Sequence, residues 1–253
     1  LDVFALAQPR SEPWAVVDAS GRVDRVVACN DAARIAGIVP GMKRSAASAL
    51  AGDLLVTRRR PDLEQMALEG LAVWAQQFTP SVALVPPDTL LLEIGGCIDY
   101  FHGLDNLYAL VREGIATQGY GVGCGCAPTP LAASWLAQAG DEQAYTEVTQ
   151  LEAALRHLPV ALLPLPAERL QDLQLLGART LGQLWGLPRK GLARRFGKGL
   201  PLLLDRALGI TPDPREVFVP PDHFSKRLEL AWAVDRTEAL LFIGRQLSIT
   251  LSG

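Results

Sequence analysis

The segment Val82-Ala83-Leu84-Val85-Pro86-Pro87-Asp88-Thr89-Leu90-Leu91-Leu92-Glu93-Ile94 consists of two apolar runs separated by a proline-rich turn. Short apolar runs divided by turn residues predict an antiparallel hairpin. We expect a buried hairpin with Asp88 at its tip, where the second strand starts. Metal-dependent phosphoryl-transfer enzymes hold Mg²⁺ with carboxylates in such positions, and they usually use several. Because Asp88 is followed by the neutral Thr89, the segment offers one carboxylate where a pair is expected.

The composition is typical of a soluble globular chain. The chain is 49% hydrophobic and 20% charged, and its 253 residues are enough for two or three packed modules. No apolar run approaches the roughly 18 residues of a membrane span, and Leu1-Asp2-Val3-Phe4-Ala5 lacks the basic start of a secretory signal. We therefore expect a cytoplasmic protein. Because the cysteines form no Cys-x-x-Cys pair, reduced thiols are favoured over a zinc site; they are Cys29, Cys97, Cys124 and Cys126.

Charge is distributed unevenly along the chain. The net charge is −3, but residues 158–215 carry nine Lys or Arg against four Asp or Glu. This basic segment on an acidic remainder suggests one surface that faces a polyanion. On charge alone, a solvated helix face is an equally good explanation.

The first 60 residues suggest a small α/β unit. Trp14–Asp18 and Arg25–Cys29 read as strands joined by a turn. A helix is expected from Asn30, a favourable N-cap, to Gly37, and another from Ser45 to Ala51.

Residues 61–150 suggest a second unit in the order α-β-β-α-β-α. A helix opens at Pro61, and the hairpin follows it as strands 81–85 and 89–95. A second helix, a strand from Gly121 to Ala127 and a helix from Pro130 complete the unit. This order fits a split βαβ sheet without its first strand. The positions expected to form the apolar helix faces are Leu63, Met66, Ala67, Leu71 and Trp74 in the first helix, and Leu104, Leu107, Leu110 and Val111 in the second.

Several stretches of the sequence carry a resemblance to a known family. The stretch Ala33-Arg34-Ile35-Ala36-Gly37-Ile38-Val39-Pro40-Gly41-Met42 resembles the fingers signature of Y-family translesion DNA polymerases. The Asp88 hairpin occupies the place of that family's palm motif, and residues 125–133 resemble its strand-to-helix element. Residues 176–184 and 196–199 resemble its thumb. Further phrases resemble the ImuB-like, catalytically impaired branch of the family, found in bacterial mutagenesis cassettes; they are residues 78–80, 86–94, 127–133 and 187–197.

The resemblance covers nearly the whole chain and implies an α+β multi-domain architecture. The family pattern places the start of a ferredoxin-like palm at 1–13, without its first strand, and small α/β fingers at 14–60. The palm continues over 61–150, and a helical thumb with helix-hairpin-helix turns follows at 151–211. Residues 212–253 are expected to form a linker and a truncated little finger, with a strand at 227–232 and a helix at 238–251.

Matched residue by residue, the family's metal-binding and phosphate-binding groups are incomplete. Asp88 matches the palm aspartate, but Thr89 stands where the metal-binding glutamate is expected. Glu93 lies five residues further on and is expected on the opposite face, so it is no substitute. The first palm motif is expected outside this chain, since Asp2 lies too far along to be it. We therefore expect a vestigial palm site with no bound metal.

Two further elements of the nucleotide site depart from the family. Arg34 matches the arginine that grips the triphosphate, which makes it a candidate nucleotide-binding residue. Asp31, however, stands where a tyrosine usually helps, and an acid would repel the nucleotide. Pro130 and Ser134 replace two lysines of the strand-to-helix element.

The thumb keeps half of its expected DNA-binding features. At the first helix-hairpin-helix turn, residues 163–166 read Leu-Pro-Leu-Pro, and proline offers no N–H to phosphate. The second turn keeps its glycines and gains a lysine, so a non-specific, salt-sensitive phosphate contact is expected. The candidate DNA-binding residues are Arg189, Lys190, Arg194, Arg195, Gly197, Lys198 and Gly199.

Three functions remain open from the sequence. The favoured one is a non-catalytic polymerase homologue that docks on primer-template DNA in damage-induced error-prone synthesis and repair. For this function the resemblance implies an ImuA-like protein, a sliding clamp and an error-prone replicative-type DNA polymerase as partners, with contacts expected beyond Gly253. The alternative is an active but slow lesion-bypass polymerase that uses two Mg²⁺ ions. A general nucleotide- or RNA-binding module is the third.

Overall fold

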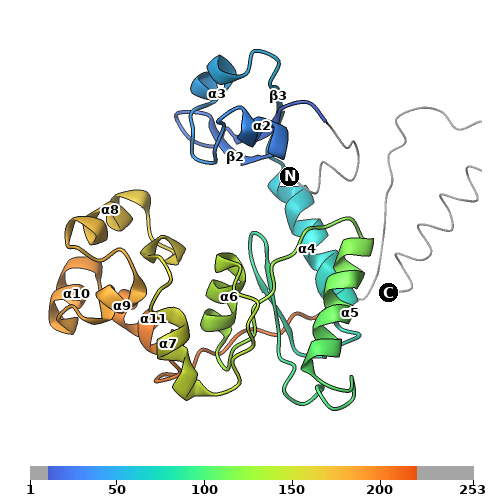
Figure 1. Cartoon of the computed structure of the whole chain (residues 1–253), viewed down its shortest axis with the longest axis vertical. Helices are drawn as coiled ribbons and strands as arrows, with labels where there is room; N and C mark the ends of the chain where they lie inside the picture. Colours follow the sequence, from blue (N-terminus) through green and yellow to red (C-terminus); the bar gives the residue numbers. More distant parts are fainter. Residues whose placement is uncertain (1–10, 221–253) are drawn as a thin grey trace, which may run out of the picture. The chain divides into compact units, whose positions relative to one another are not determined.

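The computed structural model describes residues 11–220 (Figure 1). Within this range the chain has mixed α and β content and divides into two compact units. The first unit contains residues 11–99, 117–120 and 217–220, and the second contains 100–116 and 121–216. The α+β class expected from the sequence is therefore confirmed, whereas the expected domain boundaries stay predictions. Asp2, the strand at 227–232 and the helix at 238–251 lie outside the described residues.

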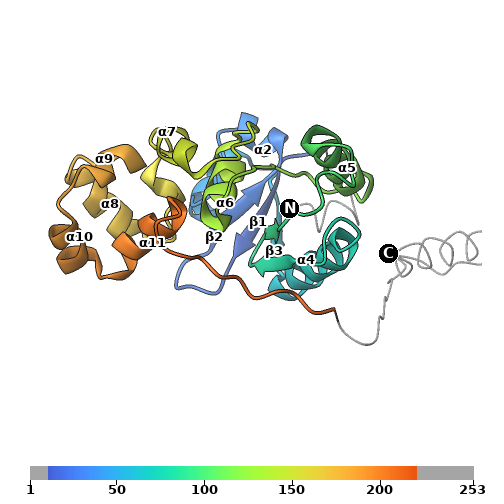
Figure 2. The same ribbon diagram turned by 90° about the horizontal axis from the view of Figure 1, so that it is seen from below.

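The first unit begins with a three-stranded sheet in the order β2-β1-β3. β1 (Trp14–Asp18) pairs antiparallel with β2 (Arg25–Cys29), as expected, and parallel with β3 (Leu55–Arg58) (Figure 2). β3 was not expected from the sequence. The outer edge of β2 is covered by the segment around Met42, whose carbonyl accepts from Val26 N at 2.9 Å. Covering a strand edge in this way protects its backbone groups from pairing with other chains.

Two short helices follow β2, and both confirm the sequence prediction. α2 (Asp31–Ile35) starts at Asn30, whose side-chain oxygen accepts from Ala33 N at 3.0 Å. The same oxygen accepts from Trp14 N at 3.0 Å, which ties the cap to β1. α3 (Arg44–Leu50) follows a turn at Gly41, where φ is +89°. Small and branched side chains from both helices and the sheet form the core, among them Ala15, Val17, Val26, Ala33, Ile38 and Ala47.

The predicted hairpin is present and packs on one helix. β4 (Val82–Val85) and β5 (Thr89–Leu92) form an antiparallel pair in which Val85 faces Thr89 across the ladder. α4 (Pro61–Ala75) begins at its proline as predicted, but its buried face was misplaced. Met66 is 60% exposed, whereas the fully buried positions are Leu68, Ala72 and Ala75. The fully buried face is therefore shifted around the helix: Ala72 and Ala75 join Val82 of the hairpin in one cluster, and of the predicted positions Trp74 packs against it.

The linker also contacts this hairpin. Phe218 N donates to Val82 O at 2.7 Å, and Phe218 packs with the apolar residues between α4 and the strands. One face of the hairpin, with Val82, Leu84, Leu90 and Leu92, belongs to this cluster. Because strand side chains alternate, Thr89 belongs to the opposite face.

In the second unit, the strand expected at Gly121–Ala127 is wrong within the described part of the chain. Among the described residues the segment is assigned no strand and contributes one isolated bridge, between Cys126 and Ala144. Its glycines serve close packing instead. A Cβ on Gly123 would lie 2.8 Å from Ala137 O, and one on Gly125 only 2.5 Å from Ala133 O. The segment thus lies directly against α6 (Pro130–Ala139), which begins at its predicted proline.

α5 (Leu104–Thr117) also belongs largely to the second unit and only partly matches its predicted face. Leu107 and Ile115 are buried, whereas Leu110 is exposed. The buried residues of α5 are thus two helical turns apart, whereas the prediction used residues about one turn apart.

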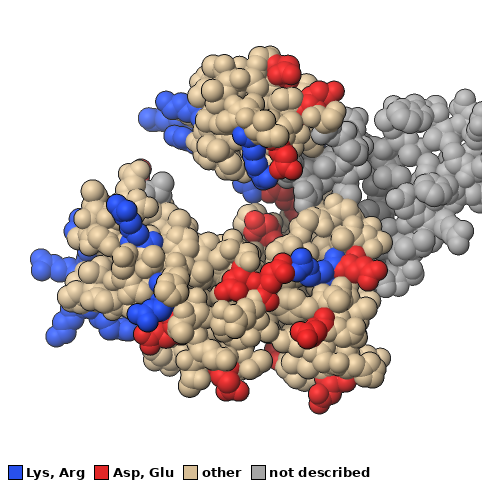
Figure 3. Space-filling model, viewed as in Figure 1, with Lys and Arg blue, Asp and Glu red and all other residues tan. Residues whose placement is uncertain are grey.

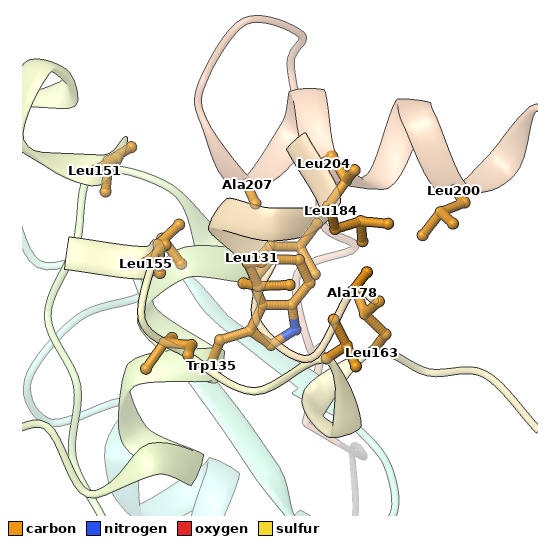
Figure 4. Close-up of a cluster of buried hydrophobic side chains, with 14 of the residues drawn as sticks. Leu131, Trp135, Leu151, Leu155, Leu163, Ala178, Leu184, Leu200, Leu204 and Ala207 are labelled. Atoms are coloured by element: carbon orange, nitrogen blue, oxygen red, sulfur yellow. The ribbon is translucent and has the colours of Figure 1, made fainter. Parts of the chain in front are cut away.

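The rest of the second unit is helical, as expected. Its largest apolar core joins α6 to these helices, and Figure 4 shows Leu131 and Trp135 of α6 among the leucines of the later helices. The elements are η1 (Val148–Gln150), α7 (Leu151–Leu155), η2 (Val160–Leu162), α8 (Ala167–Leu175), α9 (Leu181–Trp185), α10 (Arg189–Phe196) and α11 (Gly199–Ala207). Buried Thr129 strengthens the junction, because its hydroxyl donates to Ala207 O at 2.9 Å. α6 and the helical segment therefore share one core.

No helix among residues 11–220 has both the length and the apolar character needed to cross a membrane.

Candidate functional site

The hairpin tip holds Asp88 and Thr89 in direct contact. Asp88 is exposed on the turn after Pro87, so the expectation that it lies on a buried hairpin is wrong for the tip. Thr89 Oγ1 donates to Asp88 Oδ1 at 3.1 Å. The carboxylate of Asp88 therefore accepts a hydrogen bond from a neutral hydroxyl, and Thr89 adds no negative charge that could bind a metal ion.

The next carboxylate along the chain serves a local turn. Glu93 lies one residue past β5, is exposed, and accepts from Gly95 N at 2.9 Å. Among residues 11–220, no three His, Cys, Asp or Glu side chains form a group able to hold a metal ion. Mg²⁺ in phosphoryl-transfer sites is bound by one or two carboxylates together with substrate phosphates. Asp88 with its hydroxyl neighbour therefore supplies one carboxylate at the hairpin tip, where the resemblance leads us to expect two.

The candidate nucleotide-binding arginine is paired within its own helix. Arg34 Nη1 lies 2.8 Å from Asp31 Oδ1, and both side chains are largely exposed. The acid at the position of the expected tyrosine thus neutralises the cation expected to bind the triphosphate.

The two positions that replace lysines lie on α6 and offer no charge. Pro130 is the first residue of the helix, whose N-cap Thr129 accepts from Ala132 N at 3.3 Å. Ser134 is only 9% exposed, and its hydroxyl accepts from Gln138 Nε2 at 3.3 Å. Ser134 is therefore nearly buried and offers a neutral hydroxyl in place of a charge.

Four of the candidate DNA-binding side chains gather on the hairpin between α10 and α11. Lys190, Arg194, Arg195 and Lys198 are exposed, and none forms an ion pair with another described residue. The connecting Gly197 has φ +87°, a conformation that favours glycine. Three of these cations lie on α10 and Lys198 follows Gly197 in the connecting turn, so the structure places this part of the predicted set along α10 and the turn that ends it.

Arg189 differs from the other members of the set. Its guanidinium pairs with Asp205 on α11, and this hydrogen-bonded carboxylate raises the pKa of Arg189. Asp205 is mostly buried, so Arg189 fastens the start of α10 to α11. The pairing leaves Arg189 less available to phosphate than its neighbours.

The first predicted turn differs from the second. Leu163 is buried, and Leu165 N donates to Leu163 O at 2.7 Å. The flanking Pro164 and Pro166 have no N–H. The N–H of Leu163 donates to Val160 O at 3.1 Å. None of the four residues 163–166 therefore presents a free backbone donor.

Sequence reasoning missed Arg169 on α8. Its Nη1 donates to Arg195 O at 3.1 Å, and its guanidinium lies 6.0 Å from the centroid of the Phe196 ring. Arg169 thus holds the end of α10 next to the basic hairpin. Its position in a charged helix was the only available signal, because a bond to a backbone carbonyl 26 residues away leaves no local pattern.

Positive and negative side chains are concentrated in different parts of the described chain. Between residues 61 and 157 the sequence carries two arginines against twelve Asp or Glu. In Figure 3, blue side chains gather over α8 and α10, while red ones predominate around α5 and α6. An acidic surface repels phosphate, so within the second unit the α10–α11 hairpin is the electrostatically favoured place for a polyanion.

Two cysteines lie in a partly buried cluster with Tyr108. Burial raises the pKa of the Cys124 and Cys126 thiols, and it is also the main cause of the raised pKa of Tyr108. The nearby Arg112 is paired with Glu142 at 2.6 Å. These thiols are therefore held in their protonated form at neutral pH.

Comparison with known proteins agrees with this geometry. Residues 2–138 match the model of the impB/mucB/samB family. The chain is 36% identical over 173 residues to protein ImuB of Caulobacter vibrioides, a match covering 68% of this chain and 38% of that protein. It is 28% identical over 227 residues to DNA polymerase IV of Dehalococcoides mccartyi, covering 88% of this chain and 57% of the polymerase. The chain thus spans well under two thirds of the curated relatives it matches.

Solved structures show the same fold. DinB from Sulfolobus solfataricus superposes with a TM-score of 0.68 at 19% identity. An insertion ternary complex of Dbh DNA polymerase superposes with a TM-score of 0.69 at 20% identity. Each match covers 85% of this chain and 65% of the other. The predicted resemblance to Y-family polymerases and to ImuB is confirmed, and the chain belongs to the impB/mucB/samB family, with the fold of a Y-family DNA polymerase.

Proposed function

We propose that this chain is a non-catalytic Y-family polymerase homologue that docks on DNA during damage-induced, error-prone translesion synthesis and repair. The observation that carries the proposal is the Asp88–Thr89 contact, in which a neutral hydroxyl replaces the second carboxylate of the family's palm motif. Another polymerase then performs the chemistry.

The physical argument concerns charge. Phosphoryl transfer depends almost entirely on positioning and on neutralising the phosphates, with metal ions bridging them. Three separate positions support its loss here: Thr89 adds no charge, Asp31 neutralises Arg34, and Ser134 is buried without a cation. Each such group contributes on the order of a hundredfold or more in rate. Together these losses amount to several orders of magnitude.

DNA docking is supported by the α10–α11 hairpin. Its four cations, which form no ion pair with another described residue, lie along α10 and in the glycine-containing turn after it, which favours contact with the phosphate backbone. Such contact is independent of base sequence and weakens steeply with salt. This is the behaviour that a scaffold needs if it is to stay on DNA without selecting a site.

The partners follow from the resemblance to ImuB. They are an ImuA-like protein, the sliding clamp and an error-prone replicative-type DNA polymerase, with a cytoplasmic location. The match covers 38% of the ImuB length, so these partners belong to the proposal and not to the comparison itself.

Primer extension tests the proposal directly. The chain and the full-length Dehalococcoides relative are incubated with primer-template DNA and Mg²⁺ or Mn²⁺. We expect extension by the relative alone, while this chain retards the same DNA at low salt. Template-dependent extension that Asp88→Ala abolishes would instead identify a slow lesion-bypass polymerase.

The third function is separated by the choice of nucleic acid. Single-stranded RNA, duplex RNA and primer-template DNA are compared in the same retardation assay. Preference for either RNA over the DNA would favour a general RNA-binding module and contradict the scaffold proposal.

A further inference from the structure

Three large aliphatic side chains are exposed together on the α2–α3 part of the first unit. Ile35 is 88% exposed, and Val39 and Leu50 are each 53% exposed. Ile35 ends α2, Val39 lies in the next turn, and Leu50 ends α3. Clustered exposed aliphatics on a small module mark interaction sites more often than isolated ones do.

The backbone brings these residues to one region. Gly37, midway between Ile35 and Val39, has φ +87°, and a Cβ there would lie 3.8 Å from Leu50 Cδ1. Leu50 therefore lies against the turn that connects the other two side chains. We call Ile35, Val39 and Leu50, together with Gly37, the α2–α3 surface.

Two unpaired cations border this surface. Arg25 Nη1 donates to Gly41 O at 2.8 Å, two residues beyond Val39. Lys43 is bridged to Arg25 across the backbone, so the two side chains belong to neighbouring positions. Both are exposed, and neither forms an ion pair with any residue in the range 11–220. Between residues 14 and 60 the sequence carries eight Lys or Arg against four Asp or Glu.

These observations decide the kind of occupant. Aliphatic side chains offer nothing to a phosphate backbone, whereas they stabilise a peptide that buries its own apolar residues against them. The bordering cations favour carboxylates beside those apolar residues. An acidic peptide with aliphatic residues satisfies both parts of the surface.

We propose that the α2–α3 surface docks a partner protein through an acidic segment with exposed aliphatic residues. This inference rests on the scaffold role proposed above, because that role gives the module around α2 and α3 a use that requires no catalysis. The contact needs no nucleotide and no metal ion.

The probe is a short peptide that combines glutamate and leucine. Two matched peptides carry lysine in place of glutamate, or serine in place of leucine. Binding to the whole chain is followed through the methyl resonances of Ile35, Val39 and Leu50. We expect the first peptide to shift these methyls and to bind about tenfold more tightly than either matched peptide.

Surface variants connect binding to the named residues. Ile35→Ser with Val39→Ser should weaken binding of the first peptide about tenfold, while Leu175→Ser, at an equally exposed position on α8, should leave affinity unchanged. Arg25→Gln with Lys43→Gln should remove the preference for glutamate over lysine. Because all these positions are exposed, thermal unfolding should confirm that every variant is folded.

Two outcomes would overturn the inference. The first is a failure of peptide recognition: either no methyl shifts up to millimolar peptide, or equal affinity for all three peptides. The other is a shift of the same methyls by primer-template DNA that Arg25→Gln with Lys43→Gln abolishes, which would assign the surface to nucleic acid. The Lys198→Ala variant separates this inference from the DNA-docking proposal. It should weaken retardation of primer-template DNA and leave the affinity for the peptide unchanged.

Discussion

The Thr89 hydroxyl donates a hydrogen bond to the Asp88 carboxylate across 3.1 Å at the exposed tip of the hairpin. The two residues that mark the ancestry of the palm thus engage each other. Because the Thr89 hydroxyl is uncharged, it hydrogen-bonds the Asp88 carboxylate without adding a second carboxylate ligand for a metal ion.

Replacing Thr89 by glutamate tests how much of the site has been lost. Thr89→Glu should create Mn²⁺ binding at the tip, with a dissociation constant on the order of millimolar, detected by paramagnetic broadening of nearby resonances. Asp88→Asn in the same background should remove it. Extension activity should stay absent, because Arg34 remains paired and Ser134 remains buried. Recovery of extension by this single change would show that the loss is confined to one residue.

The Asp31–Arg34 pair predicts a gain in nucleotide affinity on substitution. Asp31→Asn removes the charge that neutralises Arg34 and should strengthen binding of a nucleoside triphosphate at low salt about threefold, as expected for an exposed pair. A fluorescent triphosphate titration measures the change. Arg34→Ala in the same background should return binding to the wild-type level. Equal affinity of wild type and Asp31→Asn would show that this arginine no longer faces a nucleotide.

The salt dependence of DNA binding separates contact from positioning. Lys198→Ala should weaken retardation and lower the slope of log affinity against log salt by about 1, since one phosphate contact is lost. Arg169→Lys keeps its charge but loses the bond to Arg195 O, so it should weaken binding with an unchanged slope. Both measurements use one primer-template at several salt concentrations. A reduced slope for Arg169→Lys would make Arg169 a direct phosphate contact.

Sequence patterns predicted the elements whose ends carry residues with strong backbone preferences. Asn30 caps α2 through its side chain, and prolines at 61 and 130 occupy the first positions of α4 and α6. The hairpin was predictable because two apolar runs flank a proline turn. In each case the signal lies within a few residues and needs no distant partner.

The misplaced features depend on distant contacts. Gly121–Ala127 alternates like a strand, yet two of its glycines, Gly123 and Gly125, lie directly against α6, which no local pattern indicates. The face of α4 is set by the hairpin that packs on alanines, which the spacing of its larger side chains conceals. For the candidate site, the sequence indicated the missing charges, but the pairing of Arg34 with Asp31 and the burial of Ser134 required the folded chain.

The cysteine cluster predicts a loss of stability at high pH. Burial raises the pKa of Cys124 and Cys126 in the folded state. Their contribution is therefore fully present below the unfolded pKa of about 8.5 and is lost as pH rises through the folded values. Urea midpoints measured with reductant from about pH 8 to about pH 10.5, a range that spans the unfolded pKa, should fall more steeply for wild type than for Cys124→Ala with Cys126→Ala. Tyr108, Arg112 and Glu142 are common to both proteins, so parallel slopes would contradict the assignment.

Thr129 predicts the largest effect on stability, because one buried hydroxyl serves two elements. It donates to Ala207 O at 2.9 Å and accepts from Ala132 N at 3.3 Å, joining the start of α6 to the end of α11. Thr129→Val keeps the shape but loses the N-cap, about 1 kcal/mol, and a bond to a buried carbonyl, about 1–3 kcal/mol. The second unit should lose about 2–4 kcal/mol, measured by native-state hydrogen exchange at Leu136 and Leu181. Thr129→Ser retains both bonds and should cost less than about 1 kcal/mol. Equal losses for the two variants would mean that the methyl group, and not the hydroxyl, holds α6 against the helical core.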